Sequence, residues 1–445
     1  MTAEAIWHEL LMANQKEWIA SIPDLKKKLD DAGVVFGGRQ LCNHLRPKFL
    51  TTDEAANLTA VSEAVMSGIM AAKDRLLTDP ALMAMLNLTE IEKEMVSHDP
   101  GYEHVAPCVR LDSFITDKGV QFVELNGECP AGPAFGDQLA DVFFDHPLSR
   151  AFAERFEVEY VRTLPPLLDT LLSCYREYDS SNKTPTIAIV DYDFVPTVVE
   201  FQLCADYFES QGYPTIVCDP RELEYDGQTL TAKGKKIDLV YKRVLMNEFI
   251  EKYDEVKNMY LAYRDHNVCV VNPFRSKLVH KKAIFAVLTS DGRDEWLPAE
   301  LAAKIDLAVP WTRNVMESKT NFEGQEIDLL DFTVKNREKF VMKPNDDYGG
   351  KGIYLGWEMT DGEWDEALKD ALAGDYIVQT RLHMIPEQFP SMEKNLEEQS
   401  LFVDLDPYMY LGKMFGALAR LGAGGLCNVS SGGGQVPILI VGKSR

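Results

Sequence analysis

The sequence lacks an excess of positive charge. Its 46 Lys and Arg residues are outnumbered by 70 Asp and Glu residues, which gives a formal net charge of -24. Nucleic-acid binding depends on clustered Lys and Arg that displace counterions from phosphates, so we expect no nucleic-acid partner. The charge is compatible with a cationic substrate, although net charge mainly governs solubility and long-range steering.

Paired cysteines and targeting segments are also missing. None of the eight cysteines falls in a C-x-x-C pair, and the eight histidines show no ligand spacing beside them. We therefore expect a reduced cytoplasmic protein without structural zinc. The first 22 residues mix charged and apolar positions and predict neither a signal peptide nor a transit segment. No apolar run is typical of a membrane span, so we expect no membrane partner, and the oligomeric state stays open.

The length of 445 residues, with 46% hydrophobic and 26% charged residues, predicts a globular protein of two or three domains. Helical spacing of apolar residues from Leu58 to Ile69, after a capping candidate at Thr52 and Asp53, predicts a helical packing layer. The polar stretch at 178–185 is a predicted domain boundary. We expect three regions, at 1–180, 181–275 and 276–445.

The middle region predicts a parallel sheet. Strand candidates lie at 186–190, 215–218, 238–241 and 268–271, and a helix is predicted at 198–210. Strands separated by helices are typical of a parallel α/β unit. In the third region a helix is predicted from Ser276 to Leu288, followed by strands at 340–343, 352–355 and 376–379.

A glycine-rich segment at 340–353 is the first candidate for chemistry. It places Lys343 on a strand, followed by a loop with three glycines and Lys351. Glycines let backbone N–H groups approach an anion, and ammonium groups supply the charge that a triphosphate needs. An ordinary hairpin would give the same pattern. The segment is neither a Walker A loop nor a Rossmann loop, and a kinase is excluded because H-R-D and D-F-G are absent.

The second candidate is a predicted hairpin of two strands at 109–115 and 120–125. Residues two apart lie on the same face of a strand. Arg110 and Asp112 therefore share one face of the first strand, and Glu124 and Asn126 share one face of the second. If the strands pair, the four side chains converge. Carboxylate and amide oxygens are ligands that Mg²⁺ takes together with phosphate oxygens. A solvated polar face with cross-strand ion pairs is the alternative.

The third candidate is Arg420, which ends a predicted strand that begins at Phe415 and opens into a glycine-rich loop at 422–434. The pattern indicates an anion-binding residue beneath a mobile lid, with a flexible surface loop as the alternative. Asp404 and Asp406 precede a proline and are interpreted first as turn formers.

Together these segments resemble the ATP-grasp ligases, and within them the circularly permuted branch that contains glutathionylspermidine synthetase and eukaryotic glutathione synthetase. The family pattern R-x-D, then E-x-N-x-x-x-P, is similar to five residues in this sequence: Arg110, Asp112, Glu124, Asn126 and Pro130. The E-x-N motif also precedes the nucleotide lysines, as in that branch. The resemblance implies an α/β ATP-grasp fold of circularly permuted order with an inserted parallel-sheet domain.

The resemblance also implies roles for individual residues. Asp112, Glu124 and Asn126 would hold Mg²⁺, and Arg110 and Arg420 would act as catalytic arginines. A larger set would bind ATP, comprising two lysines, the loop over the phosphates and the adenine hinge: Lys282, Lys343, Gly349, Gly350, Lys351, Gly352, Gln379 and Leu382.

The function implied is an ATP- and Mg²⁺-dependent ligase that joins a small-molecule or short-peptide carboxylate to an amine through an acyl phosphate. The family's N-A-D-T-P-T is replaced here by N-G-E-C-P-A at 126–131, which makes glutathione doubtful as the substrate. The residues before Arg110 lack a Cys/His amidase signature, so no amidase activity is expected. An ATP-dependent phosphotransferase and a non-catalytic ATP-binding module are the alternatives.

Overall fold

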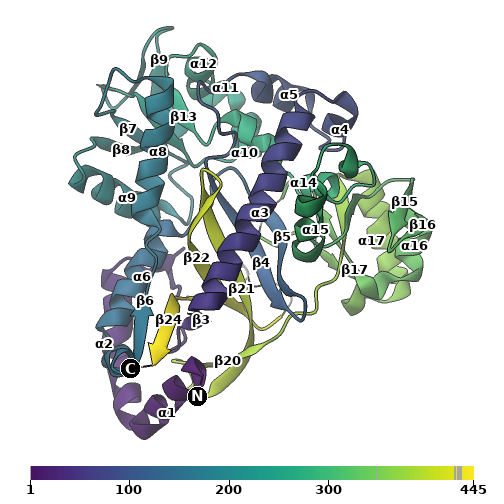
Figure 1. The fold of residues 1–445 in the computed structure, drawn as a ribbon. Helices are drawn as coiled ribbons and strands as arrows, with labels where there is room; N and C mark the ends of the chain where they lie inside the picture. Colours follow the sequence, from purple (N-terminus) through teal and green to yellow (C-terminus); the bar gives the residue numbers. More distant parts are fainter. Residues whose placement is uncertain (1, 348, 425–426, 428–432, 445) are drawn as a thin grey trace.

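The computed structural model describes residues 2–347, 349–424, 427 and 433–444. Its centre is an antiparallel sheet in the order β23-β22-β21-β4-β5, with β20 paired to β21 (Figure 1). The strands are β4 (Cys108–Thr116), β5 (Gly119–Asn126), β20 (Glu387–Pro390), β21 (Glu398–Tyr410), β22 (Lys413–Gly422) and β23 (Gly434–Val436). The sheet therefore joins an N-terminal hairpin to the C-terminal part of the chain.

The register of this sheet aligns the polar residues of the sequence motifs. Strands β4 and β5 form the predicted hairpin, in which Arg110 pairs with Asn126 and Asp112 with Glu124. On the other side, β21 pairs with both β4 and β22, and Asp404 lies opposite Arg420. The prediction that the four hairpin residues converge is confirmed.

Helix α3 (Thr52–Leu76) crosses one face of the central sheet (Figure 1). It packs against β21, β22, α14 (Ala283–Leu288) and α15 (Ala299–Ala308). The predicted apolar stripe is confirmed, since Leu58, Val65 and Ile69 are all buried. The cap lies one residue earlier than expected, because Thr51 and Glu54 form a capping box.

The same helix has the length and mean hydropathy of a membrane span, with a hydropathy of 1.2 over its most apolar window. The sequence reading that no run resembles such a span is therefore wrong by length and composition. The buried stripe on the central sheet accounts for its apolar residues, as in the core helices of folded domains.

The middle region forms the predicted parallel sheet, in the order β13-β12-β7-β8. Its strands are β7 (Ile187–Val190), β8 (Thr215–Cys218), β12 (Leu239–Lys242) and β13 (Cys269–Val271). Helix α9 (Val198–Ser210) has the predicted bounds and packs on β8. The chain moves outward from β7 to β8 and then returns to the other side of β7 with β12.

A third sheet, in the order β14-β19-β17-β18, lies on the side of the central sheet where β5 is the edge strand (Figure 1). It contains β14 (Thr312–Asn314), β17 (Phe340–Pro344), β18 (Tyr354–Leu355) and β19 (Tyr376–Thr380). Helix α17 (Asp361–Ala373) packs on β17 and β19. The predicted strand at 352–355 begins later, because Gly352 has a φ of 70° and cannot extend the strand.

The helix predicted from Ser276 to Leu288 is broken into α13 (Lys277–His280) and α14. The backbone N–H of Lys282 donates to the carbonyl of Asn345 at 2.9 Å, and that of Ala283 donates to the Asn345 side chain at 2.8 Å. These bonds replace the helical hydrogen bonds at this point, so tertiary contacts override the helical pattern.

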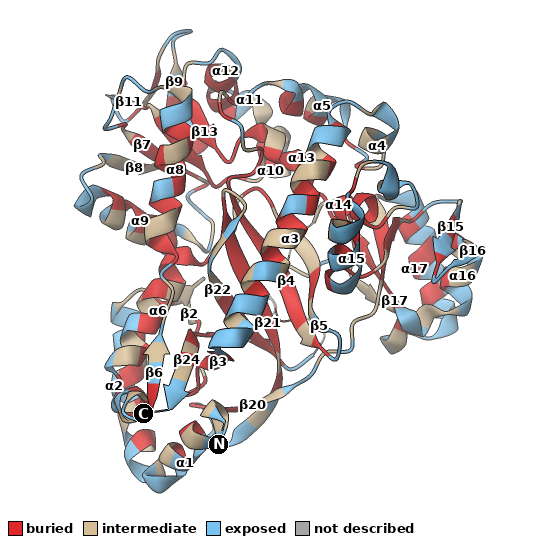
Figure 2. Cartoon of the chain, viewed as in Figure 1, coloured by how far each residue is buried: buried red, intermediate tan, exposed pale blue. Residues whose placement is uncertain are grey.

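A smaller group of helices and strands, in the lower part of the view in Figure 1, completes the fold. It contains α1 (Ala3–Ala13), α2 (Gln15–Asp31), α6 (Pro133–Asp145), α7 (Pro147–Ala153) and the sheet β3 (Lys48–Thr51), β24 (Ile438–Ser444) and β6 (Phe156–Glu159). Figure 2 shows that the strands of the central sheet are buried along most of their length, while the outer faces of the helices are exposed. The interior of the molecule therefore lies around β4, β21 and β22.

Gly356, directly after β18, lies against the backbone of the segment before β17. A Cβ atom at this position would lie 2.0 Å from the carbonyl oxygen of Arg337. We expect Gly356→Ala to lower the free energy of unfolding by about 1–3 kcal/mol, measured by urea unfolding. Gly362→Ala is the matched control, because Gly362 lies in α17 with open space around its Cβ position, and should stabilise by up to about 1 kcal/mol. Equal effects of the two changes would contradict this packing.

Candidate active site

Five charged side chains from three neighbouring strands meet inside the central sheet: Arg110, Asp112, Asp404, Asp406 and Arg420. Each is less than one-tenth exposed. Nη2 of Arg420 lies 2.6 Å from Oδ2 of Asp112 and 2.9 Å from Oδ2 of Asp406, and it also donates to Asp404. Nε of Arg110 donates to Oδ1 of Asp112 at 2.8 Å. Because isolated buried ions are costly, these groups form one mutually dependent network.

The network shifts the pKa values of its carboxyl groups in different directions. Burial favours the protonated form of each, but attraction to Arg110 and Arg420 holds the pKa of Asp112 below its ordinary value. At Asp406 burial dominates, and repulsion by Asp112 and Asp404 adds to it, so the pKa is raised well above its ordinary value. Asp112 is therefore kept ionised, which is the form that a metal ligand needs.

Two carboxylates and an amide line the open side of this network. Nδ2 of Asn126 donates to Oδ1 of Asp112 at 2.9 Å, so the amide oxygen of Asn126 is not used in that bond. The Glu124 side chain is 24% exposed, and its Oε2 lies 3.4 Å from Nζ of Lys282. These oxygen donors fit Mg²⁺, with Asp112 shared between the metal and the arginines. The other cluster of close carboxylates, Asp112 with Asp404 and Asp406, is already bridged by Arg420.

Lys343 lies on β17, on the opposite side of the cleft from Glu124. Its side chain is 8% exposed, and Nζ donates to Oε1 of Gln379 at 2.9 Å. Burial lowers the pKa of Lys343 to about 8, and repulsion by Lys282 acts in the same direction. The lysine is therefore a cation whose burial is poorly compensated, and a nearby anion would stabilise it.

Lys282 connects the glycine-rich segment to the metal ligands. Its Nζ donates to the backbone carbonyl of Asp347 at 2.6 Å while facing Glu124. The base of the same segment is fixed by Lys277, whose Nζ lies 2.6 Å from Oδ1 of Asp346 and 3.3 Å from Oε1 of Glu128. The break between α13 and α14 thus places Lys282 between this segment and Glu124.

The glycine-rich segment itself is a hairpin between β17 and β18. Gly349, Gly350 and Gly352 have φ values of 73°, 79° and 70°, which favour glycine over other residues. Lys351 is exposed. Both readings of the sequence are therefore compatible with the geometry, since the segment is a hairpin and also carries the backbone conformation of an anion-binding loop.

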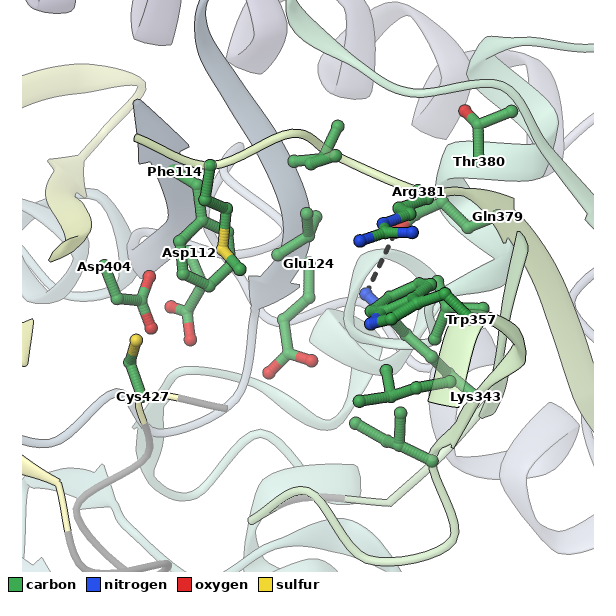
Figure 3. Close-up of a pocket in the computed structure, with 16 residues that line it drawn as sticks. Asp112, Phe114, Glu124, Lys343, Trp357, Gln379, Thr380, Arg381, Asp404 and Cys427 are labelled. Carbon is green, nitrogen blue, oxygen red and sulfur yellow. Dashed lines mark hydrogen bonds between the residues drawn. The ribbon is translucent and has the colours of Figure 1, made fainter. Parts of the chain in front are cut away.

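Two cavities meet at Asp112 and Glu124. The first has a volume of about 90 Å³ and is also lined by Lys343, Gln379 and Leu382 (Figure 3). Its remaining lining is largely apolar and consists of Phe114, Val123, Val341, Ile353, Leu355, Trp357, Thr380, Arg381, Met384, Asp404 and Cys427. Two predicted metal ligands, Asp112 and Glu124, therefore line one cavity with three of the predicted nucleotide-binding residues, although they come from different parts of the fold.

The second cavity has a volume of about 380 Å³ and lies on the other side of the two carboxylates. Predicted site residues in its lining are Arg110, Asp112, Glu124, Asn126, Gly349 and Arg420. Residues of the parallel α/β unit close the far wall, among them Asp191 after β7 and Arg243 after β12. Ligands of α/β sheets bind at the carboxyl ends of strands where the strand order reverses, as it does between β7 and β12.

Arg243 differs from the other two arginines of this cavity. It is 5% exposed, its Nη1 donates to Pro130 O at 2.7 Å and to the hydroxyl of Tyr241 at 2.9 Å, and its Nε has no hydrogen-bond partner. The nearest carboxylate, Glu200, lies 4.0 Å away. Arg110 and Arg420 donate to carboxylates, whereas the hydrogen bonds of Arg243 go to neutral acceptors, so the charge of Arg243 is the least compensated of the three.

From the sequence, two site residues were ranked below the others and a third was not found. Asp404 and Asp406 are not turn formers, because they lie inside β21, and the alternation of apolar and acidic residues at 402–406 was the available signal. Arg243 could have been found from its position directly after a buried parallel strand.

Other predicted residues lie apart from the cavities. Among the described residues, Lys351, Gly350 and Gly352 line neither cavity, and Lys282 reaches the site only through Glu124. Most of the predicted lid at 422–434 lies outside the described residues, so the lid stays a prediction.

The ion network predicts the effect of removing its central cation. Arg420→Ala leaves three buried carboxylates without their shared donor, so the free energy of unfolding should fall by about 3–5 kcal/mol in urea titrations. Arg150→Ala, which removes an arginine side chain that is 65% exposed, is the control and should leave the unfolding midpoint unchanged. Similar midpoints for the two variants would contradict the network.

No protein-family model matches the sequence, and no curated protein matches it. Among solved structures, the chain is similar to the apo form of a glutathione synthetase-like effector from Globodera pallida. The identity is 13%, the TM-score is 0.58, and the match covers 96% of this chain and 98% of that chain.

Two further structures match with lower scores. A gamma-glutamylcysteine synthetase-like protein from Methylobacillus flagellatus has 10% identity, a TM-score of 0.39 and coverage of 82% and 84%. A RimK-domain ATP-grasp protein from Sphaerobacter thermophilus has 10% identity, a TM-score of 0.27 and coverage of 52% and 91%. The chain has a mixed α/β fold like that of the glutathione synthetase-like effector, as its motifs predict.

Proposed function

We propose that this protein is an ATP- and Mg²⁺-dependent ligase that joins a carboxylate to an amine through an acyl phosphate. The observation that carries the proposal is that two cavities of different character meet at Asp112 and Glu124. One cavity holds a buried lysine beside apolar side chains, and the other holds three arginines. Such an arrangement suits the transfer of a phosphoryl group from a nucleotide to a carboxylate.

The nucleotide side of the reaction is assigned to Lys343 and Lys282. Their ammonium groups would neutralise phosphate oxygens, and Glu124, Asn126 and Asp112 would hold Mg²⁺. The metal, when bound, supplies charge stabilisation to the phosphates. Backbone N–H groups of the glycine-rich segment at 349–352 would contact the phosphates, which agrees with the positive φ values of its glycines.

The substrate side is assigned to the second cavity. Arg110 lies beside Asp112 at the junction, so its guanidinium is suited to hold the reacting carboxylate, and Arg420 fixes Asp112 from behind. Arg243 is suited to bind an anionic group farther along the substrate. Since an acyl phosphate is hydrolysed by water, the chemistry also requires closure of the site, for which the loop at 422–434 is our candidate.

The test is a screen of amino acids, short peptides and polyamines in pairs with ATP and Mg²⁺. ADP and phosphate release are measured, the products are analysed by mass spectrometry, and hydroxylamine is added to trap acyl phosphates. We expect an amide product and, with hydroxylamine, a hydroxamate. A stable phosphorylated product without amide would favour a phosphotransferase, and ATP binding without any ADP release would favour a non-catalytic module.

Glu124→Gln is the matched variant for this screen. Its carboxylate is partly exposed and makes one ion pair, with Lys282, so the fold and its unfolding midpoint should be preserved. Loss of the charge at the metal site should lower turnover by roughly 100-fold or more, as for other electrostatic groups at reacting centres. Turnover within a few fold of the wild type would remove Glu124 from the proposed site.

The pKa of Lys343 gives an independent prediction. Because burial lowers this pKa from 10.5 to about 8, most Lys343 side chains are neutral at pH 8.5 before nucleotide binds. Phosphate oxygens favour the charged lysine, so MgADP binding should take up roughly three quarters of a proton at pH 8.5 and almost none at pH 6.5. Isothermal titration in buffers of different ionisation enthalpy measures the uptake.

Lys343→Arg is the control for this prediction, because arginine keeps its charge at both pH values and its complex should show no uptake from this position. The same proton uptake in the variant and the wild type would show that another group titrates.

A further inference from the structure

The first cavity has two chemically different ends. The close-up in Figure 3 shows the carboxylates of Asp112 and Asp404 at one end, Glu124 in the middle, and Trp357 and Arg381 at the other end with Lys343 beside them. A nucleotide whose phosphates lie beside the metal-binding carboxylates therefore points its base toward the end with Trp357 and Arg381. These two residues have no part in the proposed chemistry of phosphates and metal.

Arg381 lies stacked on Trp357. Its Cζ is 4.3 Å from the centre of the indole ring, which is a cation–π contact. Within the part of the chain that the structure describes, the guanidinium makes no ion pair and no side-chain hydrogen bond. The backbone N–H of Arg381 donates to the carbonyl of Lys339 at 2.8 Å, so the main chain is fixed while the side chain is held by the ring alone.

The indole is anchored better than the arginine. Trp357 lies two residues after the end of β18, in the short helical segment η5 (Gly356–Glu358), and its Nε1 donates to Glu358 at 3.2 Å. Gly356, which precedes it, is packed against the backbone of Arg337. Of the two stacked groups, Arg381 is therefore the one that can leave its place at lower cost.

The cavity is small for a nucleoside, so a lining side chain that moves aside would make room for the base. A volume of about 90 Å³ holds roughly six to nine water molecules, which is less than a nucleoside needs. The apolar walls Val341 and Leu355 belong to paired strands, and moving them would break the β17–β18 register. The Arg381 side chain has no such constraint, and its planar guanidinium lies where a stacked base would lie.

We propose, building on the function above, that Trp357 is the stacking platform for the purine base of the nucleotide and that Arg381 occupies this platform only while the nucleotide is absent. Binding exchanges one planar group for another on the same face of the indole. Trp357 thus contributes to nucleotide affinity, whereas Arg381 competes with the base.

The test measures MgADP affinity in Trp357→Leu, Trp357→Phe and Arg381→Ala by isothermal titration. Trp357→Leu should weaken binding roughly five- to 150-fold, the range for loss of one base–aromatic stack, while Trp357→Phe stays within about fivefold of the wild type. Arg381→Ala should bind equally well or up to about fivefold more tightly, because a competing cation–π contact is lost. Arg150→Ala, an exposed arginine away from the cavity, is the control and should bind as the wild type does.

Two further readouts separate stacking from a structural effect. Inorganic tripolyphosphate carries no base, so its binding should be the same in Trp357→Leu and the wild type. The chain has six tryptophans, and the fluorescence change caused by MgADP should be lost in Trp357→Phe if it comes from Trp357. Equal weakening of tripolyphosphate and MgADP binding in Trp357→Leu would overturn the proposal.

The outcomes also separate this inference from the proposed function. If the wild type binds MgADP but Arg381→Ala binds it more than fivefold more weakly, Arg381 is a ligand and the exchange proposed here is wrong. The ligase proposal would survive that result. If the wild type binds neither MgADP nor MgATP, both proposals fail together.

Discussion

The antiparallel pairing of β4 with β21 is the contact on which the site depends. It joins Cys108–Thr116 to a strand almost 300 positions later, and it aligns Asp404 with Phe114 and Tyr408 with Arg110. Through this pairing the hairpin that carries Glu124 becomes continuous with the strand that carries Arg420. The contact is long-range and costs chain entropy, so its stability must come from the buried surface and from the ion network that crosses it.

That network explains why charged residues can lie at the centre of the fold. Arg420 forms ion pairs with three carboxylates, and Arg110 forms one with Asp112. Each buried charge of the network therefore has a partner of opposite sign. The arrangement also limits what these arginines can do. Their charges are already compensated by carboxylates, so Lys343 and Arg243 are the buried cations of the site with the most to gain from an anionic ligand.

Local patterns in the sequence predicted the elements well, whereas their contacts depended on tertiary structure. The hairpin, α9 and the parallel strands follow from periodicity of apolar residues, and the directions of Asp112, Glu124 and Asn126 follow from strand geometry. The break at Lys282 did not follow, because Asn345, more than 60 residues away, takes the backbone bonds. Asp406 was interpreted first as a turn former for a related reason: a proline after an aspartate is typical of a turn, but here β21 continues through it.

The proposed function requires that a metal and a polyphosphate lie between the β4–β5 hairpin and β17. A crystal structure with Mg²⁺ and a non-hydrolysable ATP analogue tests this claim most directly. We expect the metal to contact oxygens of Glu124 and Asn126, and phosphate oxygens to lie within hydrogen-bonding distance of Nζ of Lys343. A nucleotide bound elsewhere, or phosphates that do not approach Lys343 and Glu124, would contradict the account.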